Sequence, residues 1–306
     1  MEGENLLFTL MEQGNVKNNN QDVRITLAKH AGFCFGVRDA VEIASNAAER
    51  HGTVYMFGHI VHNERVVKQL ADAGVKVVDS LDDVKDGPVL FRAHGTPNYV
   101  WDEARKRGLE IIDATCPLVH EIHDEVKKME QDGRQIYVIG DKGHDEVLGI
   151  MSQAENPILI STPEEARTLR KKKRGGVVAQ STQMVENVQE IISILMMKIK
   201  DLRFINTVCH PTRQNQVELK ELATQNDLMI VIGSFTSANT KRLAALAKSL
   251  NPRSYQVEGA DDVNPDWFTD VCSVGIHAGA STPDVTIREV HKRVQSLTSG
   301  PIPEVA

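Results

Sequence analysis

The chain has 306 residues, a hydrophobic fraction of 41% and a formal net charge of -7. This length exceeds what one hydrophobic core usually supports, so we expect several domains, and the composition excludes a largely disordered chain. The acidic balance argues against nucleic-acid binding, and no segment reaches the ~18 consecutive apolar residues that cross a bilayer. The first residues lack a basic segment followed by an apolar run, so no secretory signal is expected. These features predict a cytoplasmic protein without nucleic-acid or membrane partners.

Short β-branched runs alternate with helical patterns from Val23 onward. The first four expected elements are a strand over 23–28, a helix over 36–50, a strand over 54–57 and a helix over 63–73. Gly52 and Gly74 are the expected helix stops, because glycine readily adopts the left-handed conformation that ends a helix. This alternation continues to the end and is typical of parallel α/β units. The basic run 170–174 is expected to be a solvated helix end.

Three cysteines mark an internal repeat. Each stands 24 positions before a glycine that ends an apolar strand; the pairs are Cys34 and Gly58, Cys116 and Gly140, and Cys209 and Gly233. Polar residues recur four and six positions after each glycine: His62 and Glu64, His144 and Glu146, and Ser237 and Asn239. A second polar strand end follows in each third, at 93–96, 179–182 and 278–282. Self-similarity at a long period is a signal of the fold.

The repeat predicts three related α/β lobes with pseudo-threefold symmetry around a shared centre. The expected parts are an N-terminal extension (1–22), three lobes (23–113, 114–206 and 207–297) and a C-terminal tail (298–306). Ligands of open α/β sheets bind beyond the carboxyl ends of the strands, so the polar strand ends are expected to line a common site.

Each of the three cysteines precedes a predicted helix. Pro117 follows Cys116 directly and Pro211 comes two residues after Cys209, and proline is favoured in a first helical turn. The helix dipole and free amides favour the thiolate, which is the form that binds metal. A lone cysteine is more often a buried thiol, but the equivalent placement in three repeats favours metal ligands. Cys272 lies in an apolar strand over 271–276 and is assigned to the core.

The ligand pattern favours some metals over others. No C-x-x-C pair occurs, which argues against a zinc ribbon or finger. A Cys3His zinc site with His30 or His210 stays open. Three thiolates at a threefold centre better suit a 4Fe-4S cluster with one iron that has no cysteine ligand. Such an iron can act as a Lewis acid.

The polar loops predict a phosphate or diphosphate pocket. His62, His94 and His144 fall on strand-to-helix turns, where backbone N–H groups bind anions and imidazole adds a donor. The other candidates are Ser181, Thr182, Ser237, Asn239, Ser281 and Thr282. Helix capping alone explains any single one of these hydroxyl groups. No G-x-x-x-x-G-K-[ST] motif occurs, so a P-loop is excluded.

Glu146 stands two residues after His144 and beside the expected metal centre. A carboxyl group next to a diphosphate and a reduced cluster should have a raised pKa and can deliver a proton. The alternative is an acidic residue favoured by the helix dipole in a first turn. We favour proton delivery for Glu146 and the dipole role for Glu64.

Taken together, the motifs resemble those of the 4-hydroxy-3-methylbut-2-enyl diphosphate reductase family of the non-mevalonate isoprenoid pathway. The motifs that carry the resemblance are 32–37 (GFCFGV), 61–63 (VHN), 93–95 (AHG), 113–119 (DATCPLV), 143–147 (GHDEV), 179–183 (AQSTQ), 207–209 (TVC) and 278–284 (AGASTPD). They occur in the family's order, and the resemblance covers residues 24 to about 297.

The resemblance implies a three-lobed α/β fold around a 4Fe-4S cluster held by Cys34, Cys116 and Cys209. It implies that the diphosphate binds at His62, His94, His144, Ser237, Asn239 and Ser281. Glu146 matches the family's proton-relay carboxylate, and Ser181 and Thr182 match two hydroxyl residues near the substrate's alcohol. Ala238 departs from members that carry a serine there, so one side-chain contact to the diphosphate is absent.

The implied reaction is reductive dehydroxylation of an allylic diphosphate. The substrate hydroxyl binds the open iron, Glu146 with Thr182 supplies a proton, and two electrons enter through the cluster. The products are isopentenyl and dimethylallyl diphosphate. The family takes its electrons from a ferredoxin, a flavodoxin or a nicotinamide-linked reductase. No G-x-G-x-x-G follows a strand here, so direct nicotinamide binding is not expected.

Two other classes of protein are compatible with the three cysteines. One is a redox-neutral cluster enzyme, such as a hydro-lyase or a quinolinate-synthase-like protein, whose turnover needs no reductant. The other is a non-catalytic zinc or cluster sensor, which needs neither Glu146 nor the histidine loops.

Overall fold

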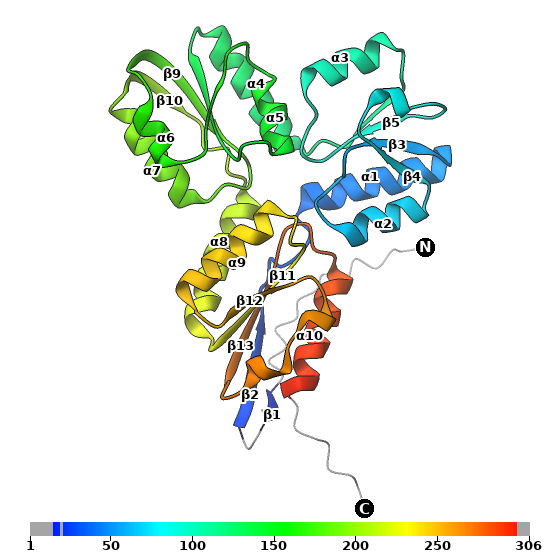
Figure 1. The fold of residues 1–306 in the computed structure, drawn as a ribbon, viewed down its shortest axis with the longest axis vertical. Helices are drawn as coiled ribbons and strands as arrows, with labels where there is room; N and C mark the ends of the chain where they lie inside the picture. The colour runs from blue at the N-terminus through cyan, green and yellow to red at the C-terminus, as the bar shows by residue number, and fades with distance from the viewer. Residues whose placement is uncertain (1–14, 19–20, 299–306) are drawn as a thin grey trace, which may run out of the picture.

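Three α/β lobes meet at a common centre in the computed structural model, which describes residues 15–18 and 21–298 (Figure 1). Each lobe is built on its own sheet, and the sheets have the strand orders β4-β3-β5-β6, β8-β7-β9-β10 and β1-β2-β13-β11-β12. Within the described residues, every strand pair is parallel except β1 with β2. The expected three-lobed α/β architecture is therefore confirmed.

The first lobe has helices on both faces of its sheet. Its strands are β3 (Val54–Phe57), β4 (Val75–Val78), β5 (Val89–Phe91) and β6 (Ile111–Asp113). Its helices are α1 (Phe35–His51), α2 (Glu64–Asp72), the short 3-10 helix η1 (Leu81–Asp83) and α3 (Asn98–Lys106). Alanines of α1 and branched residues of α2 pack on one face, whereas η1 and α3 pack on the other.

The second lobe repeats this arrangement. Its strands are β7 (Gln135–Ile139), β8 (Ile158–Ile160), β9 (Lys172–Ala179) and β10 (Ile199–Phe204). Its helices are α4 (Pro117–Gln131), α5 (Asp145–Met151), α6 (Pro163–Thr168) and α7 (Val185–Met196). Helices α4 and α5 cover one face of the sheet, and α6 and α7 cover the other.

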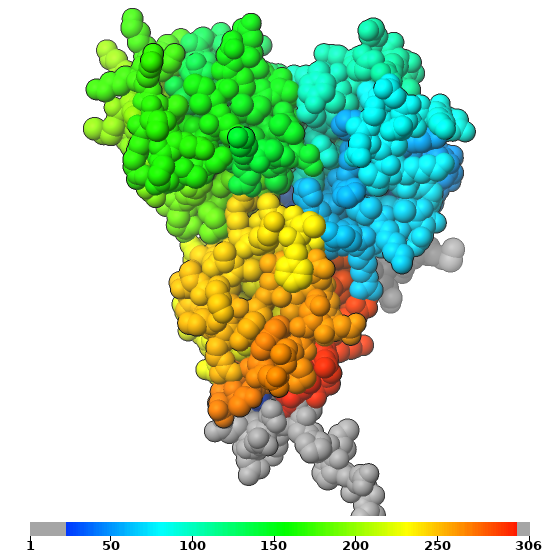
Figure 2. Space-filling model, viewed as in Figure 1, coloured from blue at the N-terminus to red at the C-terminus, as the bar shows by residue number. Residues whose placement is uncertain are grey.

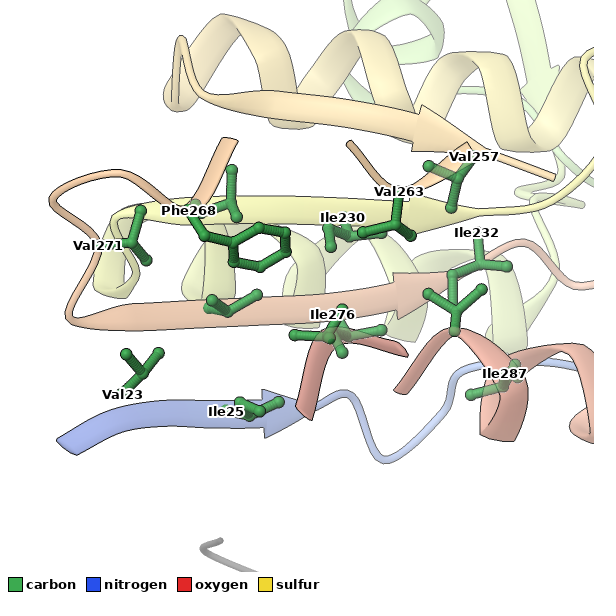
Figure 3. Close-up of a cluster of buried hydrophobic side chains, with 14 of the residues drawn as sticks. Val23, Ile25, Ile230, Ile232, Val257, Val263, Phe268, Val271, Ile276 and Ile287 are labelled. Atoms are coloured by element: carbon green, nitrogen blue, oxygen red, sulfur yellow. The ribbon is translucent and has the colours of Figure 1, made fainter. Parts of the chain in front are cut away.

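The third lobe joins the two ends of the described chain. Its strands are β1 (Asn15–Asn18), β2 (Gln21–Leu27), β11 (Leu228–Ile232), β12 (Ser254–Val257) and β13 (Ser273–Ala278). Its helices are α8 (His210–Gln225), α9 (Ala238–Leu250), α10 (Asp284–Thr298) and the 3-10 helices η2 (Ala260–Asp262) and η3 (Pro265–Phe268). Figure 3 shows Ile25 of β2 beside Ile276 of β13 and Ile230 of β11 in one buried apolar layer.

The third sheet corrects one sequence-based expectation. The strand expected at 23–28 was assigned to the first lobe, but β2 pairs with β13, with Ile25 opposite Val274. In this position β2 corresponds to β6 beside β5 and β10 beside β9. The chain therefore passes to another lobe between β2 and α1, between β6 and α4, and between β10 and α8, and a cysteine stands at each passage.

Three further local expectations differ from the structure. Residues 15–18 form an edge strand within the expected loose extension, while residues 1–14 lie outside the described residues. The basic run 170–174 leads into strand β9, which begins at Lys172, instead of ending a helix. Cys272 is exposed instead of buried in the core, and it directly precedes β13.

Ion pairs join each pair of lobes. Arg92 Nη1 lies 2.9 Å from Asp145 Oδ2 between the first and second lobes, and Arg65 Nη1 lies 2.6 Å from Glu289 Oε2 between the first and third. Arg242 of α9 pairs with Asp141, which follows β7, and so joins the third lobe to the second. Figure 2 shows the three lobes as separate masses that meet at a central junction.

Candidate active site

The three cysteines have the same local structure in the three lobes. Cys34, Cys116 and Cys209 are the N-cap residues of α1, α4 and α8, as the sequence predicted. Their backbone N–H groups donate to Ala280 O (3.3 Å), Ala93 O (3.0 Å) and Ser181 O (3.0 Å), which lie in the loops after β13, β5 and β9. Each cysteine is thus anchored on a polar loop of the lobe that the chain has just left.

The three thiols line one cavity with an empty volume of about 810 Å³, open solvent at its mouth included. Gly36 lets two of the cysteine loops approach each other, because a Cβ atom there would lie 2.4 Å from Cys116 Sγ. Burial, with smaller contributions from the neighbouring Cys209 and Cys116, raises the pKa of the Cys34 thiol to about 11. Burial also raises the pKa of Cys116 and Cys209. Three buried thiols that disfavour each other's ionisation need a cationic partner to become thiolates.

The donor set of the cavity is soft, because three cysteine thiols line it together. Among the described residues, no three or more His, Cys, Asp or Glu side chains are grouped closely enough to hold one metal ion. His30 and His210, which the sequence offered as a fourth zinc ligand, line a different surface hollow beside Glu218. Three soft thiol ligands that line one cavity fit an iron–sulfur cluster.

Thr212 is a contact that the sequence interpretation missed. Its Oγ1 lies 3.0 Å from Cys209 Sγ within the first turn of α8, and this hydrogen bond lowers the pKa of the thiol against the effect of burial. The Cys-x-x-Thr spacing at a predicted helix start was the available signal, because residues at these positions meet across the first turn.

Three histidines form a second group on the cavity wall. The ring centroids of His62 and His94 lie 4.8 Å apart, and those of His62–His144 and His94–His144 are 5.5 and 5.7 Å apart. Desolvation lowers the pKa of all three histidines, that of His144 to about 4. At least one cationic neighbour of each ring also disfavours its protonated form. The ligand-free rings are therefore neutral at pH 7, and an anion among them favours their protonated, donating forms.

The hydrogen bonds of these histidines leave donors for a ligand. His144 Nδ1 accepts from the backbone N–H of Glu146 at 3.2 Å, so its Nε2 carries the hydrogen of the neutral ring. His94 Nδ1 is buried without a partner among the described residues. A buried ring nitrogen without a partner is costly unless a ligand satisfies it.

The third lobe supplies hydroxyl and amide groups instead of histidines. Ser237 caps α9 by accepting from Thr240 N at 3.3 Å, and Ser281 Oγ lies 3.4 Å from His62 O. The buried Nδ2 of Asn239 has no partner within the described chain. All three residues line the same cavity as the histidines and the thiols. The structure therefore brings the expected metal ligands and the expected diphosphate contacts together.

Glu146 is buried within this cavity. Its carboxylate accepts hydrogen bonds from Ser181 N at 2.6 Å and from Ser181 Oγ at 3.0 Å. Glu146 as a whole is only 1% exposed. Burial raises the pKa of Glu146 to about 7, although the two bonds from Ser181 oppose the shift. The shift has the expected direction, but its main cause is burial within the protein and not the diphosphate and cluster on which the expectation rested. Glu146 also raises the pKa of Cys116 and Cys209, which places it beside the cysteine centre.

The hydroxyl that contacts Glu146 belongs to Ser181, whereas the resemblance paired Glu146 with Thr182. Thr182 lines the cavity too, but its Oγ1 accepts from Gln180 Nε2 at 3.1 Å and lies 3.5 Å from Arg242 Nη1. The sequence interpretation missed Gln180 and Arg242. Gln180 stands next to Ser181 in the motif 179–183, whereas Arg242 is distant in sequence and reaches this motif only in the folded chain.

The fold and the site define a three-lobed α/β protein in which three equivalent cysteines, a histidine triad and a buried carboxyl group share one cavity. The family model described as "LytB protein" matches residues 25–295. A 4-hydroxy-3-methylbut-2-enyl diphosphate reductase of Geobacter sulfurreducens is 44% identical over 276 residues, which cover 90% of this chain and 98% of that protein. The reductase of the same name from Aquifex aeolicus is 39% identical, and the match covers 91% of this chain and 98% of that protein. This chain belongs to the LytB family of oxidoreductases.

Two solved structures support this assignment. A structure of (E)-4-hydroxy-3-methyl-but-2-enyl diphosphate reductase, described as the terminal enzyme of the non-mevalonate pathway, has 39% sequence identity and a TM-score of 0.67. It covers 89% of this chain and 99% of its own. The E-1-hydroxy-2-methyl-but-2-enyl-4-diphosphate reductase of Plasmodium falciparum has 29% sequence identity and a TM-score of 0.85. The match covers 94% of this chain and 90% of that one. In the described part of this chain, no helix combines the length and apolarity needed to cross a bilayer.

Proposed function

We propose that this protein reduces (E)-4-hydroxy-3-methylbut-2-enyl diphosphate to isopentenyl and dimethylallyl diphosphate, the terminal step of the non-mevalonate pathway. The observation that carries the proposal is one cavity that holds three thiols, three histidines and the buried Glu146. Two relatives, at 44% and 39% identity, are named as this reductase, which supports the proposal. The reaction takes up two electrons and two protons, breaks the C–O bond of the alcohol and releases water.

Cys34, Cys116 and Cys209 would hold a 4Fe-4S cluster at the junction of the lobes. When bound, such a cluster supplies electrons one at a time and offers the iron without a cysteine ligand as a Lewis acid. The protein contributes the three thiolates, and the helix starts favour them through free N–H groups and the dipole. Thiols that must stay reduced fit a reducing, cytoplasmic compartment.

The diphosphate would bind among the histidine triad and the third lobe's Ser237, Asn239 and Ser281. The buried nitrogens of His94 and Asn239 that lack a partner support this placement, because an anion's oxygens would satisfy them. Loops before helices add backbone N–H donors. Binding at one end of the cavity holds the substrate's alcohol toward Glu146 and the cysteine centre, and this orientation lowers the barrier by removing a search over positions.

Glu146 would deliver the proton with which the hydroxyl leaves as water. Its pKa of about 7 keeps a substantial protonated fraction at neutral pH, as a general acid requires. Ser181 Oγ, 3.0 Å from Glu146 Oε2, can pass the proton or hold the carboxyl group in place. Apolar residues that line the same cavity, among them Val61 and Val119, exclude water that would compete for the proton.

The electrons would come from an external ferredoxin, flavodoxin or nicotinamide-linked reductase system. The test is an anaerobic assay of the iron-loaded protein with the allylic diphosphate and a chemical reductant. Formation of the two isoprenoid diphosphates only when reductant is present supports the proposal. If the iron-loaded protein leaves the substrate unchanged, the proposal fails, and turnover without reductant would indicate a redox-neutral enzyme.

A further inference from the structure

Gln180 follows β9 and is fully buried, with no exposed surface. Its Oε1 accepts from the backbone N–H of Asp141 at 3.0 Å and from Gln183 Nε2 at 3.3 Å. A backbone N–H can only donate, so this bond fixes the oxygen end of the Gln180 amide on Asp141. The amide nitrogen must then face the opposite side, where Thr182 lies.

Thr182 Oγ1 receives hydrogen bonds from two groups that cannot accept. Gln180 Nε2 donates at 3.1 Å, and Arg242 Nη1 approaches at 3.5 Å while it donates to Thr182 O at 3.0 Å. A threonine hydroxyl has two acceptor positions and one hydrogen. With both acceptor positions facing donors, its own hydrogen points away from Gln180 and Arg242. Thr182 lines the cavity, so that hydrogen is available to a ligand.

Asp141 fixes the other members of this group. Its carboxylate pairs with Arg242 and accepts from Gln183 Nε2 at 3.2 Å. Arg242 belongs to α9 of the third lobe, whereas Asp141 and Gln180 belong to the second. The orientation of the Thr182 hydroxyl therefore depends on the contact between these two lobes.

We propose that Gln180, supported by Asp141 and Arg242, is a positioning residue that holds the Thr182 hydroxyl as a hydrogen-bond donor toward the substrate's alcohol oxygen. This inference rests on the proposed function and adds a second donor to the proton donor Glu146. A donor set in advance toward an oxygen that gains charge stabilises the transition state more than the bound substrate. Gln180 acts through Thr182 and does not line the cavity.

The test is the near-isosteric variant Gln180→Glu, with kcat and KM measured against pH in the iron-loaded protein. The introduced carboxyl group still donates to Thr182 when it is protonated, whereas its ionised form accepts the hydroxyl hydrogen and turns it away from the cavity. Burial and the facing Asp141 and Glu146 raise the pKa of this new carboxyl group, and Arg242 lowers it. We expect kcat near the wild-type value at acid pH and about 10- to 100-fold lower at alkaline pH, with KM changed less.

Two further variants separate positioning from a loss of structure. Gln216→Glu introduces the same charge at another buried glutamine, whose amide bonds to the backbone of Val185 and Gln183 and not to Thr182. It should show no new ionisation in kcat. In a Thr182→Val background, Gln180→Glu should have little further effect, because the hydroxyl that it reorients is gone.

The inference is overturned if Gln180→Glu keeps the wild-type kcat and pH profile, or if its effect is unchanged in the Thr182→Val background. It is also overturned if Gln216→Glu produces the same pH-dependent loss. In each of these results the wild-type protein remains an active reductase, so the proposed function stands. Inactive iron-loaded wild-type protein would instead remove the proposed function and this inference with it.

Discussion

The cysteine centre and the anion pocket share one cavity but treat the threefold repeat differently. At the centre, Cys34, Cys116 and Cys209 cap equivalent helices and are anchored by equivalent backbone hydrogen bonds. In the pocket, the first two lobes contribute the histidines, whereas the third contributes Ser237, Asn239 and Ser281.

The difference follows from the two ligands that these regions are proposed to hold. A cluster held by three equivalent cysteines needs three equal donors, so repetition of one lobe supplies them. An allylic diphosphate has a charged end and an alcohol end, so its site needs unequal groups on its walls. The lobes have kept the backbone frame of the repeat and changed the side chains at the loop ends.

The largest effect should come from breaking the symmetric region. Cys34→Ser, Cys116→Ser and Cys209→Ser each remove one of three equal ligands. All three variants should therefore lose cluster iron, and their activity should fall more than about 1,000-fold. Iron content and reductant-dependent turnover of the three variants are the measurements. Retention of the wild-type iron content by any one of them would contradict the equivalence.

Loss of the proposed proton donor should rank second. Glu146→Gln keeps nearly the same shape and can retain a bond to Ser181, so iron content should stay at the wild-type value while kcat falls about 100- to 10,000-fold. The wild-type kcat should decrease as pH rises through about 7, because the acid must be protonated. The kcat–pH profiles of both proteins check this, and a wild-type rate in the variant would remove Glu146 from the mechanism.

In the asymmetric pocket, loss of a histidine should reduce the affinity for diphosphate more than loss of a serine. Replacing His94 by Phe removes a donor that becomes cationic beside an anion, so the affinity for inorganic diphosphate should fall about 10- to 100-fold. Ser281→Ala, the matched change in the third lobe, removes a neutral donor and should cost only about 2- to 10-fold. Calorimetric titration compares them, and equal losses would argue against the contrast drawn between the lobes.

The smallest effect is expected at the fourth cysteine. Cys272 is exposed and precedes β13, while the loop that faces the cavity follows that strand, which is roughly 20 Å long. Cys272→Ser should therefore keep full iron content and change the free energy of unfolding by less than about 0.5 kcal/mol. Iron analysis and a denaturant titration test this, and loss of iron would mean that Cys272 is itself a metal ligand.

The sequence was sufficient where local signals dominate. Glycines after helices, prolines after cysteines and the spacing of 24 residues predicted the helix starts at Cys34, Cys116 and Cys209 and the strands β3 and β11 within a residue. These features depend on capping and periodicity, which act over a few residues.

Features that depend on non-local pairing were beyond the sequence. Strand β2 lies at the N-terminal end of the described chain yet completes the third sheet through β13, because a parallel strand position can be filled from either end of the chain. Edge strand β1 is largely polar and carries no alternating pattern. The choice of Ser181 over Thr182 as the partner of Glu146 is set by tertiary contacts of Gln180 and Arg242.

The iron and acid-labile sulfide content of anaerobically prepared wild-type protein tests the proposed cysteine centre most directly. Three thiols from three lobes that share one cavity predict about four iron and four sulfide per chain after reconstitution, with zinc absent. One zinc per chain, or a folded protein that takes up neither iron nor sulfide, would contradict the assignment of the cysteine centre.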